Sequence, residues 1–307
     1  MEVVFLGTPQ FAVATLEAVA ATGHHIVAVY TQPDRPKGRG QQTAFSPVKE
    51  AALRLGLTVK QPERVRRPEV VEELRAMNAD VMVVVGYGQI IPQVIIDLPR
   101  FGILNVHASL LPKYRGAAPI QWAIANGERT TGVTIMQIEA GLDTGPMIAV
   151  AETEIGSEET APELSERLAV MGAQLLVDTV AHLPANPVVQ DHANATLAPI
   201  LKKEDGRIDW TMPAHAIACR MRGFTPWPGA FTTFRGEPMK VIRARVADIP
   251  NSPLCGAIIA NNKRLFIGCG GATVLELLEI QMEGRKKIAA DAFLNGFRPL
   301  DNEVLGG

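Results

Sequence analysis

Short apolar runs alternate with amphipathic stretches over the first 183 residues. Five runs have the length and the β-branched composition of buried strands: Val3–Leu6, Ile26–Tyr30, Val81–Val85, Ile103–Val106 and Val133–Ile138. Helical periodicity lies between them, at Phe11–Ala21, Pro47–Leu55, Pro68–Met77, Ile120–Ala125 and Thr160–Leu183. Repeated strand–helix units with continuously apolar strands are typical of a parallel sheet covered on both faces. The pattern predicts an α/β fold: a Rossmann-like domain with a mostly parallel sheet.

The pattern changes from about Pro184. A polar stretch punctuated by Pro184, Pro187 and Pro199 is typical of a linker. Beyond Gly206 we expect one helix and then short strands, at Ala214–Arg222, Ala230–Phe234, Met239–Val246, Ala257–Ile259, Leu265–Ile267 and Thr273–Ile280. This second pattern predicts a small C-terminal β-barrel, OB-like or of another small-barrel type. The expected boundaries are residues 1–186 for the first domain, 187–205 for the linker and 206–307 for the barrel.

Composition supports a packed protein of two domains. The chain has 307 residues, of which 47% are hydrophobic and 20% charged. The net charge of −2 is uneven, because residues 206–307 hold 13 Lys/Arg and 9 Asp/Glu, a net of +4. That surplus indicates a negatively charged partner at the C-terminal region or, equally, a chance imbalance on a solvated surface.

The cysteines and the hydropathy pattern bear on the compartment. Cys219, Cys255 and Cys269 are odd in number and lack metal-ligand spacing, which favours a reduced, cytoplasmic protein. The opening MEVVFLGTPQF has no basic leader, so we expect no signal peptide. No apolar run is long enough for a membrane span. We therefore expect a cytoplasmic monomer that does not bind a membrane.

The first strand–helix turn excludes the common nucleotide cofactors. The sequence Gly7-Thr-Pro-Gln-Phe11 has one glycine, and Pro9 has no N–H to offer a pyrophosphate. The chain also has no phosphate-binding GxxxxGK[ST] loop. No histidine pair has zinc-ligand spacing backed by a third ligand, so we expect no metal.

Polar side chains gather at the end of one apolar strand. Asn105 and His107 are two residues apart, so both point to the same face, and the strand stops before Pro112. A neighbouring strand runs into Glu139-Ala-Gly-Leu-Asp143-Thr-Gly-Pro146, a turn that presents Asp143. Ligands of open α/β sheets bind at the carboxyl ends of the strands. Alone, each residue is more often a cap or a turn former, but together they indicate a site.

These motifs resemble the tetrahydrofolate-dependent formyltransferases. The resemblance rests on NVHASLLPKYRG at residues 105–116 and GLDTG at 141–145, and it extends to FLGTPxFA, PDRPKGRG, VVVGYGQIIP and KEDGRIDW. It implies transfer of a formyl group from 10-formyltetrahydrofolate to the amino group of methionine on initiator tRNA. The Asn105, His107 and Asp143 set is shared by the broader family, whereas the loop at residues 31–42 and the C-terminal domain point to tRNA.

The three polar residues suit this chemistry. Attack of an amine on the formyl carbon creates an oxyanion, and donors placed at that charge lower the barrier by a few kcal/mol each. We expect the Asn105 amide and a protonated His107 to be those donors. Asp143 would favour the charged imidazole and receive the proton lost by the amine, directly or through water.

Two further segments have roles that the resemblance implies. The glycine-containing loop after the third strand would bind the pterin through its backbone, and the turn after His107 would bind the rest of the folate. The residues concerned are Gly86, Tyr87, Gly88, Gln89, Ile90 and Ile91 in the first, and Ser109, Leu110, Leu111 and Pro112 in the second. Without the resemblance, the first loop reads as an ordinary strand–helix connection.

The basic loop at residues 31–42 is long for a compact α/β domain. Its cations Arg35, Lys37 and Arg39 would contact the acceptor stem of the tRNA, and the resemblance gives Arg39 the largest part. A solvated loop is the alternative. Further cations lie at Arg285-Lys286-Lys287 and at Arg243 and Arg245, where a solvated face is at least as good an interpretation.

Two other functions remain open at this point. A formyltransferase acting on a small amine, such as a sugar nucleotide or a purine precursor, would need neither the basic loop nor the second domain. A nucleic-acid-binding protein without catalysis would not need the complete Asn105, His107 and Asp143 set. Taken with the resemblance, the basic loop and the second domain favour tRNA as the acceptor.

Overall fold

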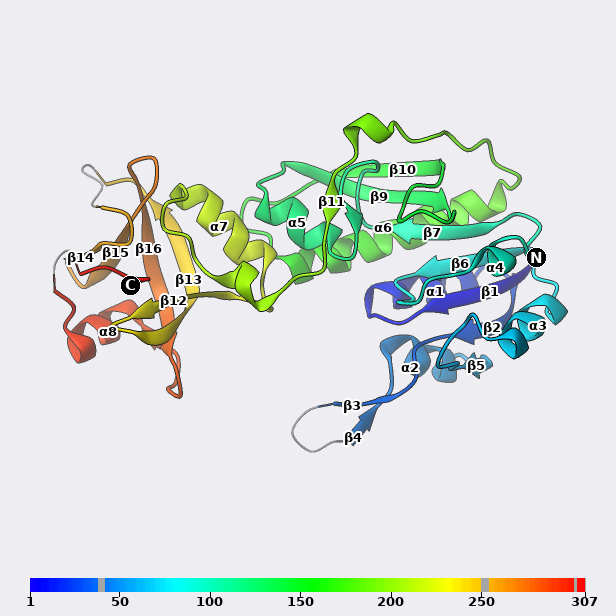
Figure 1. The fold of residues 1–307 in the computed structure, drawn as a ribbon, viewed down its shortest axis with the longest axis horizontal. Helices are drawn as coiled ribbons and strands as arrows, with labels where there is room; N and C mark the ends of the chain where they lie inside the picture. Colours follow the sequence, from blue (N-terminus) through cyan, green and yellow to red (C-terminus); the bar gives the residue numbers. More distant parts are fainter. Residues whose placement is uncertain (38–41, 250–253, 301–302, 307) are drawn as a thin grey trace. The chain divides into compact units, whose positions relative to one another are not determined.

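The computed structural model describes the chain except residues 38–41, 250–253, 301–302 and 307, and it contains two compact units (Figure 1). The first unit comprises Met1–Pro119, Thr130–Glu154 and Glu163–Pro199, and the second comprises Ile120–Arg129, Ile155–Pro162 and Ile200–Gly307. The expected boundaries treat each domain as one continuous stretch. The two units are instead interleaved along the sequence, because the short segments Ile120–Arg129 and Ile155–Pro162 pack with the C-terminal part of the chain.

A seven-stranded sheet forms the centre of the first unit, in the order β10-β9-β7-β6-β1-β2-β5. The strands are β1 (Glu2–Gly7), β2 (His25–Tyr30), β5 (Val59–Lys60), β6 (Val81–Val85), β7 (Ile103–His107), β9 (Thr130–Gln137) and β10 (Met147–Glu154). Pairing is parallel from β7 through β6, β1 and β2 to β5, and antiparallel on both sides of β9. The predicted mostly parallel, Rossmann-like sheet is confirmed.

Helices pack against this sheet (Figure 1). They are α1 (Phe11–Ala20), α2 (Pro47–Arg54), α3 (Pro68–Ala76), α4 (Gln93–Ile96) and α6 (Ala161–Ala181). Helix α2 begins where the sequence predicts, because the Ser46 side chain accepts a hydrogen bond from the Lys49 N–H and Pro47 lies in the first turn. Gly172 brings α6 close to the sheet, since a Cβ there would lie 2.8 Å from a methyl of Val106.

The basic loop is not wholly irregular. Strands β3 (Arg35–Lys37) and β4 (Gln42–Ala44) form a short antiparallel ribbon, in which Arg35 lies opposite Ala44. The predicted loop of residues 31–42 is therefore replaced by a two-stranded ribbon at its described ends. Its base is held by Lys49, which forms an ion pair with Asp34 and lowers the pKa of that carboxyl.

The stretch after α6 contacts the first unit rather than running free. Val188 and Met147 exchange backbone hydrogen bonds of 2.8 and 2.7 Å. After the 3-10 helix η1 (His192–Asn194), strand β11 (Leu197–Ala198) pairs in parallel with β8 (Arg115–Gly116). The expected linker, residues 187–205, thus begins with a segment that is docked on the first unit as far as Pro199.

An antiparallel sheet forms the centre of the second unit, in the order β12-β13-β16-β15-β14, with β17 paired to β16. The elements are η2 (Lys203–Gly206), α7 (Ala214–Gly223), β12 (Ala230–Phe234), β13 (Glu237–Ala247), β14 (Ile258–Asn261), β15 (Arg264–Cys269), β16 (Thr273–Met282), β17 (Ile288–Ala289) and α8 (Ala290–Phe297). The sequence pattern did not predict α8, whose Phe293 is fully buried and packs edge-on against Phe234 at 5.1 Å between ring centroids.

The tail of the chain joins the two edges of this sheet. The Ile258 N–H donates to the Glu303 carbonyl and the Leu305 N–H to the Gly256 carbonyl, at 2.8 and 2.9 Å. The Gly306 N–H then donates to the Thr233 carbonyl on β12 at 2.9 Å. Residues 303–306 therefore complete the barrel-like closure that the strand pattern predicts.

Helix α5 (Pro119–Ala125) packs closely on α7 within the second unit. A Cβ on Gly223 would lie 2.6 Å from the Gln121 carbonyl oxygen, so the two backbones meet where only glycine fits. Trp122 and Phe224 pack edge to face beside this contact, 5.3 Å between ring centroids. The contact explains why residues 120–129 belong to the second unit.

Candidate functional site

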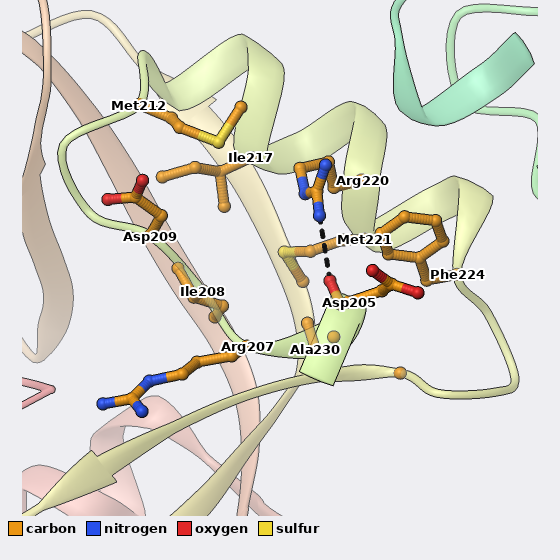
Figure 2. A pocket seen from close by; sticks show the side chains of 12 residues that line it. Asp205, Arg207, Ile208, Asp209, Met212, Ile217, Arg220, Met221, Phe224 and Ala230 are labelled. Atoms are coloured by element: carbon orange, nitrogen blue, oxygen red, sulfur yellow. Dashed lines mark hydrogen bonds between the residues drawn. The ribbon is translucent and has the colours of Figure 1, made fainter. Parts of the chain in front are cut away.

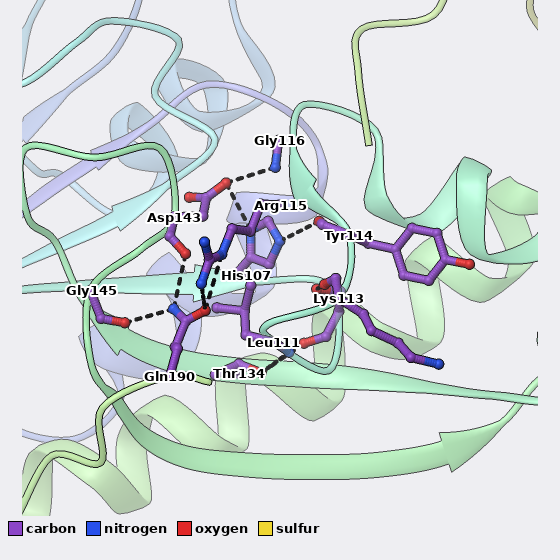
Figure 3. Close-up of polar contacts among 11 residues, drawn as sticks. His107, Leu111, Lys113, Tyr114, Arg115, Gly116, Thr134, Asp143, Gly145 and Gln190 are labelled. Atoms are coloured by element: carbon purple, nitrogen blue, oxygen red, sulfur yellow. Dashed lines mark hydrogen bonds and ion pairs between the residues drawn. The ribbon is translucent and has the colours of Figure 1, made fainter. Parts of the chain in front are cut away.

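His107 is the last residue of β7, and its buried ring is 6% exposed. Its Nε2 lies 2.9 Å from the carbonyl oxygen of Tyr114 (Figure 3). Because a carbonyl can only accept, Nε2 carries a proton and donates it to this bond. This anchor is a backbone atom, on a residue with a φ of 61°, so no residue type in the sequence points to it.

Asp143 faces the other nitrogen of the same ring. Its Oδ2 lies 3.7 Å from His107 Nδ1 and accepts a hydrogen bond of 2.8 Å from the Gly116 N–H. The structure thus brings together the imidazole and the carboxylate that the sequence predicts to meet. Asp143 has a φ of 50°, a left-handed conformation that is uncommon for residues other than glycine.

Asn105 lies two residues before His107 on β7, so both side chains project from the same face of the strand. Its side chain is 9% exposed. Within the described ranges the Asn105 amide has no hydrogen-bond partner. A nearly buried amide with free donors beside an imidazole is suited to bind a developing negative charge.

The turn after His107 is held by internal hydrogen bonds. Ser109 is fully buried, and its hydroxyl donates to the Lys113 carbonyl at 2.6 Å. Thr134 on β9 donates from its hydroxyl to the Ser109 carbonyl at 2.7 Å and accepts from the Leu111 N–H at 3.2 Å. The Ser109 hydroxyl and the Leu111 N–H therefore hold the turn. Of the four residues predicted there, Leu110 and Pro112 are the partly exposed ones.

A buried network joins Asp143 to two residues that the sequence analysis missed. Arg115 and Gln190 are 7% and 2% exposed, and the guanidinium donates to Gln190 Oε1 through Nε and Nη2, at 3.1 and 2.7 Å. The Gln190 amide donates in turn to the carbonyls of Asp143 and Gly145, at 2.9 and 2.7 Å (Figure 3). Gln190 lies in the proline-rich stretch that reads as a linker, so only its burial reveals it.

The predicted pterin loop is tied to its surroundings by most of its side chains. Tyr87 is 1% exposed, and burial raises its pKa to about 12; its carbonyl accepts from the Thr8 hydroxyl and the Gln32 amide, at 3.1 and 3.0 Å. Gln89 accepts from the Val65 N–H at 2.7 Å. Ile91 is buried as well, whereas Ile90 is 90% exposed.

Glycine supplies the backbone shape of this loop. Gly86 and Gly88 have φ values of +57° and +82°, and a Cβ on Gly86 would lie 2.9 Å from the ring of Pro9. Pro9 therefore occupies the space beside the first strand–helix turn. A dinucleotide would approach that turn through N–H groups that proline lacks.

The predicted tRNA-contacting cations are only partly within the described chain. Arg35 is exposed at the start of β3. The Arg39 backbone and the Lys37 side chain lie outside the described residues, so the structure does not test their part.

Several cations of the second unit are already paired. Arg245 and Arg264 both donate to the buried Glu276, at 2.6 to 2.7 Å, and lower the pKa of that carboxyl to about 2. Arg235 pairs with Glu303 at 2.6 Å. Three arginines of the C-terminal region are therefore held in ion pairs with carboxylates of the same region.

Other cations of that region have no acidic partner. Arg243, Lys286 and Lys287 form no ion pair with any residue in the described part of the chain. These three cations remain available to bind a negatively charged partner. Arg245 is not available in the same way, because it is paired with Glu276.

A small hollow in the second unit lies beside the junction KEDGRIDW (Figure 2). Two of its polar side chains are already bonded: Arg220 donates to the Asp205 carbonyl at 3.1 Å, and Asp209 accepts from the Thr211 hydroxyl and N–H, which lowers its pKa. Met212 and Ile217 provide apolar walls. We therefore interpret the hollow as a structural feature of the second unit and not as a ligand-binding site.

Three results bear on other kinds of site. In the described ranges, no cluster of three or more His, Cys, Asp or Glu has the geometry to hold a metal ion. No helix among the described residues is both long and apolar enough to cross a membrane. Burial raises the pKa of the Cys269 thiol to about 12, which does not favour a nucleophilic thiolate there.

Comparison with known proteins finds matches over most of the chain. Residues 1–180 match the family model described as formyl transferase, and residues 200–298 match that of the formyl transferase C-terminal domain. A methionyl-tRNA formyltransferase of Solibacter usitatus is 61% identical over 309 residues, covering 100% of this chain and 99% of the relative. That of Koribacter versatilis is 54% identical over 310 residues, again covering 100% and 99%.

A solved structure has the same fold at low identity. It is a sugar 3N-formyl transferase, determined in the presence of dTDP and 5-N-formyl-THF, with a TM-score of 0.68 and 17% identity. The match covers 93% of this chain and 99% of that one. At this identity the likeness concerns the fold alone.

Proposed function

The chain belongs to the formyl transferase family, and on that premise we propose that it transfers a formyl group from 10-formyltetrahydrofolate to the amino group of methionine carried by initiator tRNA. The observation that carries the proposal is the identity of 61% and 54%, over the whole chain, to two methionyl-tRNA formyltransferases. Conservation of length and sequence at this level supports a common substrate. The site geometry supports the same chemistry.

His107 and Asn105 act on the formyl oxygen in this proposal. The amine attacks the formyl carbon, its carbonyl becomes an oxyanion, and the bond from that carbon to the folate nitrogen then breaks. His107 Nε2 is occupied by the Tyr114 carbonyl, so Nδ1 is the ring atom left to donate to the oxyanion. The Asn105 amide, which has no hydrogen-bond partner among the described residues, is the second donor. Two such donors each lower the barrier by a few kcal/mol.

Asp143 handles the proton. Its Oδ2 is held by the Gly116 N–H, 3.7 Å from the imidazole, which is longer than a hydrogen bond and leaves room for a shared contact with substrate. The carboxylate stabilises a proton on Nδ1 and receives, directly or through water, the proton that the attacking amine loses. The leaving folate nitrogen takes up a proton as the amide product forms.

The folate would lie along the two turns that follow β6 and β7. The exposed Ile90 gives one apolar wall, and the backbone of Gly86 and Gly88 offers groups for a flat heterocycle. The turn at Ser109–Pro112 would hold the remainder of the donor. Tyr87, Gln89 and Ile91 would act indirectly, because their side chains hold the loop in place.

The tRNA would be bound by exposed cations. Arg35 on β3, with Lys37 and Arg39, would reach the acceptor stem, and Arg243 with Lys286 and Lys287 would contact phosphates. We infer a cytoplasmic enzyme, because charged initiator tRNA is used in that compartment; that it acts as a monomer stays a prediction from the sequence.

A small amine is the second candidate acceptor. The sugar 3N-formyl transferase matches 93% of this chain, so the presence of a second domain does not by itself select tRNA. The identity to the methionyl-tRNA enzymes favours tRNA over it.

One experiment separates these possibilities. Formyl transfer from 10-formyltetrahydrofolate is measured with charged initiator methionyl-tRNA, charged elongator methionyl-tRNA and an amino sugar nucleotide in parallel. We expect the highest kcat/KM with the initiator tRNA. Transfer to the sugar nucleotide alone, or to none of the three, would refute the proposal.

A further inference from the structure

We propose that Gln190, held by Arg115, is a positioning residue that fixes the turn carrying Asp143 during formyl transfer. This inference rests on the proposed function and adds two residues to it. Neither residue touches the reacting atoms; both would act through the geometry of Asp143.

The Gln190 side chain is fully used by this arrangement. Its amide group donates to the Asp143 carbonyl at 2.9 Å and to the Gly145 carbonyl at 2.7 Å, so it spans the turn. Its oxygen accepts two hydrogen bonds from Arg115, at 3.1 and 2.7 Å. The orientation of the amide is unambiguous, because carbonyls only accept and a guanidinium only donates.

Arg115 is an unusual partner for an amide. It is 7% exposed and also contacts His192 Nδ1 at 2.9 Å, and it has no carboxylate partner within the described part of the chain. A buried guanidinium without a counter-ion is costly unless its donors are satisfied. The charge strengthens its hydrogen bonds to Gln190 and fixes the amide in one orientation.

Residues of the short strand β8 hold both the main chain and the side chain of Asp143. Gly116, the second residue of β8, donates its N–H to the Asp143 carboxylate at 2.8 Å. Arg115, the first residue of β8, holds Gln190, which in turn holds the Asp143 backbone carbonyl. Strand β8 thereby sets the position of the main chain and of the side chain of Asp143 together.

The turn needs this support because Asp143 has a φ of 50°. A left-handed conformation of a residue other than glycine persists only where its surroundings impose it. A displacement of a reacting group by about 1 Å costs on the order of 100-fold in rate. Loss of the two bonds from Gln190 would let the turn relax and move the carboxylate away from His107.

Two substitutions test whether Gln190 acts through its hydrogen bonds to the turn or only by filling space. Gln190→Glu keeps the size of the side chain and an acceptor for Arg115, but it loses both donors and sets an oxygen against two carbonyls. Gln190→Met keeps similar volume and loses all four bonds. Val189→Thr is the matched control, because the adjacent Val189 side chain is 75% exposed.

The readout is single-turnover formyl transfer from 10-formyltetrahydrofolate to methionyl-tRNA, with KM for both substrates and thermal unfolding measured on each variant. We expect a rate loss of about 10- to 100-fold for both Gln190 variants, with both KM values within about twofold of wild type. Arg115→Lys, which cannot donate twice to the same oxygen, should show the same split. Val189→Thr should equal wild type.

An Asp143→Asn variant distinguishes failure of the proposed role of Asp143 from failure of the positioning role of Gln190. If Asp143→Asn retains wild-type rates, the role proposed for Asp143 fails first. If Asp143→Asn is inactive while folded Gln190→Glu and Gln190→Met transfer formyl at wild-type rates, only the positioning role is overturned. A variant that merely folds less well would lose active protein but keep its rate per folate-binding site, and this result would also overturn the inference.

Discussion

The His107 ring is fastened to the backbone of Tyr114, whose carbonyl oxygen accepts a hydrogen bond from Nε2 at 2.9 Å. This bond fixes which edge of the ring faces the reaction. Nδ1 is turned toward Asp143 Oδ2, 3.7 Å away, and both groups are largely buried. The imidazole therefore has a single nitrogen for the substrate, in a geometry set by the turn at Tyr114.

His107→Gln tests this division of labour. A glutamine amide can still donate to the Tyr114 carbonyl, but both of its N–H groups lie on that one nitrogen and it carries no charge, so it cannot replace a protonated Nδ1 on the other edge of the ring. We expect kcat to fall by about 100-fold or more, with KM for tRNA little changed, in steady-state formylation assays. His107→Ala should lose at least as much. A wild-type kcat in either variant would remove His107 from the mechanism.

Asn105→Ala should lower kcat by about 100- to 1000-fold, the usual loss for one oxyanion donor. The thermal midpoint should stay near that of wild type, because the Asn105 amide has no partner among the described residues. The control is Gln93→Ala, which removes an exposed amide whose side chain donates only to Asp97. A stability loss without a rate loss would identify Asn105 as structural.

Gly116→Ala should damage both the fold and the site. A Cβ there would lie 2.6 Å from the Ala198 carbonyl oxygen, at a φ of +123°, and would push the Gly116 N–H away from Asp143. We expect a kcat loss of about 10-fold or more and a thermal midpoint several degrees lower. Gly23→Ala isolates the cost of a positive φ, because no atom lies within 4 Å of a Cβ at Gly23. If both variants behave alike in kcat, the clash with Ala198 is unimportant.

The paired Glu276 predicts a pH dependence of stability. Hydrogen bonds from Arg264 and Arg245 depress its pKa from 4.5 to about 2, against the opposing effect of burial. A depressed carboxyl pKa contributes stability above pH 4.5, and this contribution is lost as the pH falls toward 2. Glu276→Gln should therefore lower the free energy of unfolding by roughly 1–3 kcal/mol at neutral pH, discounted because both guanidinium groups are half exposed.

Denaturant unfolding between pH 7 and pH 3 measures this effect. The difference between wild type and Glu276→Gln should shrink as the solution becomes more acidic. Glu279→Gln, on the same strand, is the control and should differ little from wild type at any pH. A gap between wild type and Glu276→Gln that stays constant with pH would contradict the assignment.

Arg39→Ala should weaken the use of tRNA while leaving folate binding intact. The prediction rests on the resemblance, since Arg39 lies outside the described residues. We expect KM for methionyl-tRNA to rise by about 10-fold, with a weaker dependence on salt because one phosphate contact is lost. Arg54→Ala is the control, an exposed arginine on α2 paired with Glu17. Equal loss of folate and tRNA binding would contradict it.

Much of the fold follows from the apolar pattern because its elements are buried. Strand β6 has five consecutive buried residues, and its bounds agree with the sequence pattern. Strand β10 was missed because it lies at the edge of the sheet, where its residues are half exposed and include alternating glutamates. The two-residue strands β8 and β11 depend wholly on each other and have no local pattern.

The site could be predicted only as far as its side chains share a strand or a motif. Asn105, His107 and Asp143 carry their chemistry in their residue types and follow apolar strands. The Tyr114 carbonyl and the Gln190 amide act through positions that only tertiary structure reveals. Gln190 in particular follows α6 by nine residues and reads as solvated linker, although it is 2% exposed.

Residues 303–306 limit where the chain can be shortened or extended without damage to the sheet of the second unit. Their backbone bonds to Thr233 on β12, to Ile258 on β14 and to Gly256 just before β14 occupy donors and acceptors at the two edges of the sheet of the second unit. Deleting these four residues would leave two open strand edges, each a template for pairing with another molecule. Shortened variants should therefore self-associate, and affinity tags belong at the amino end or behind a spacer.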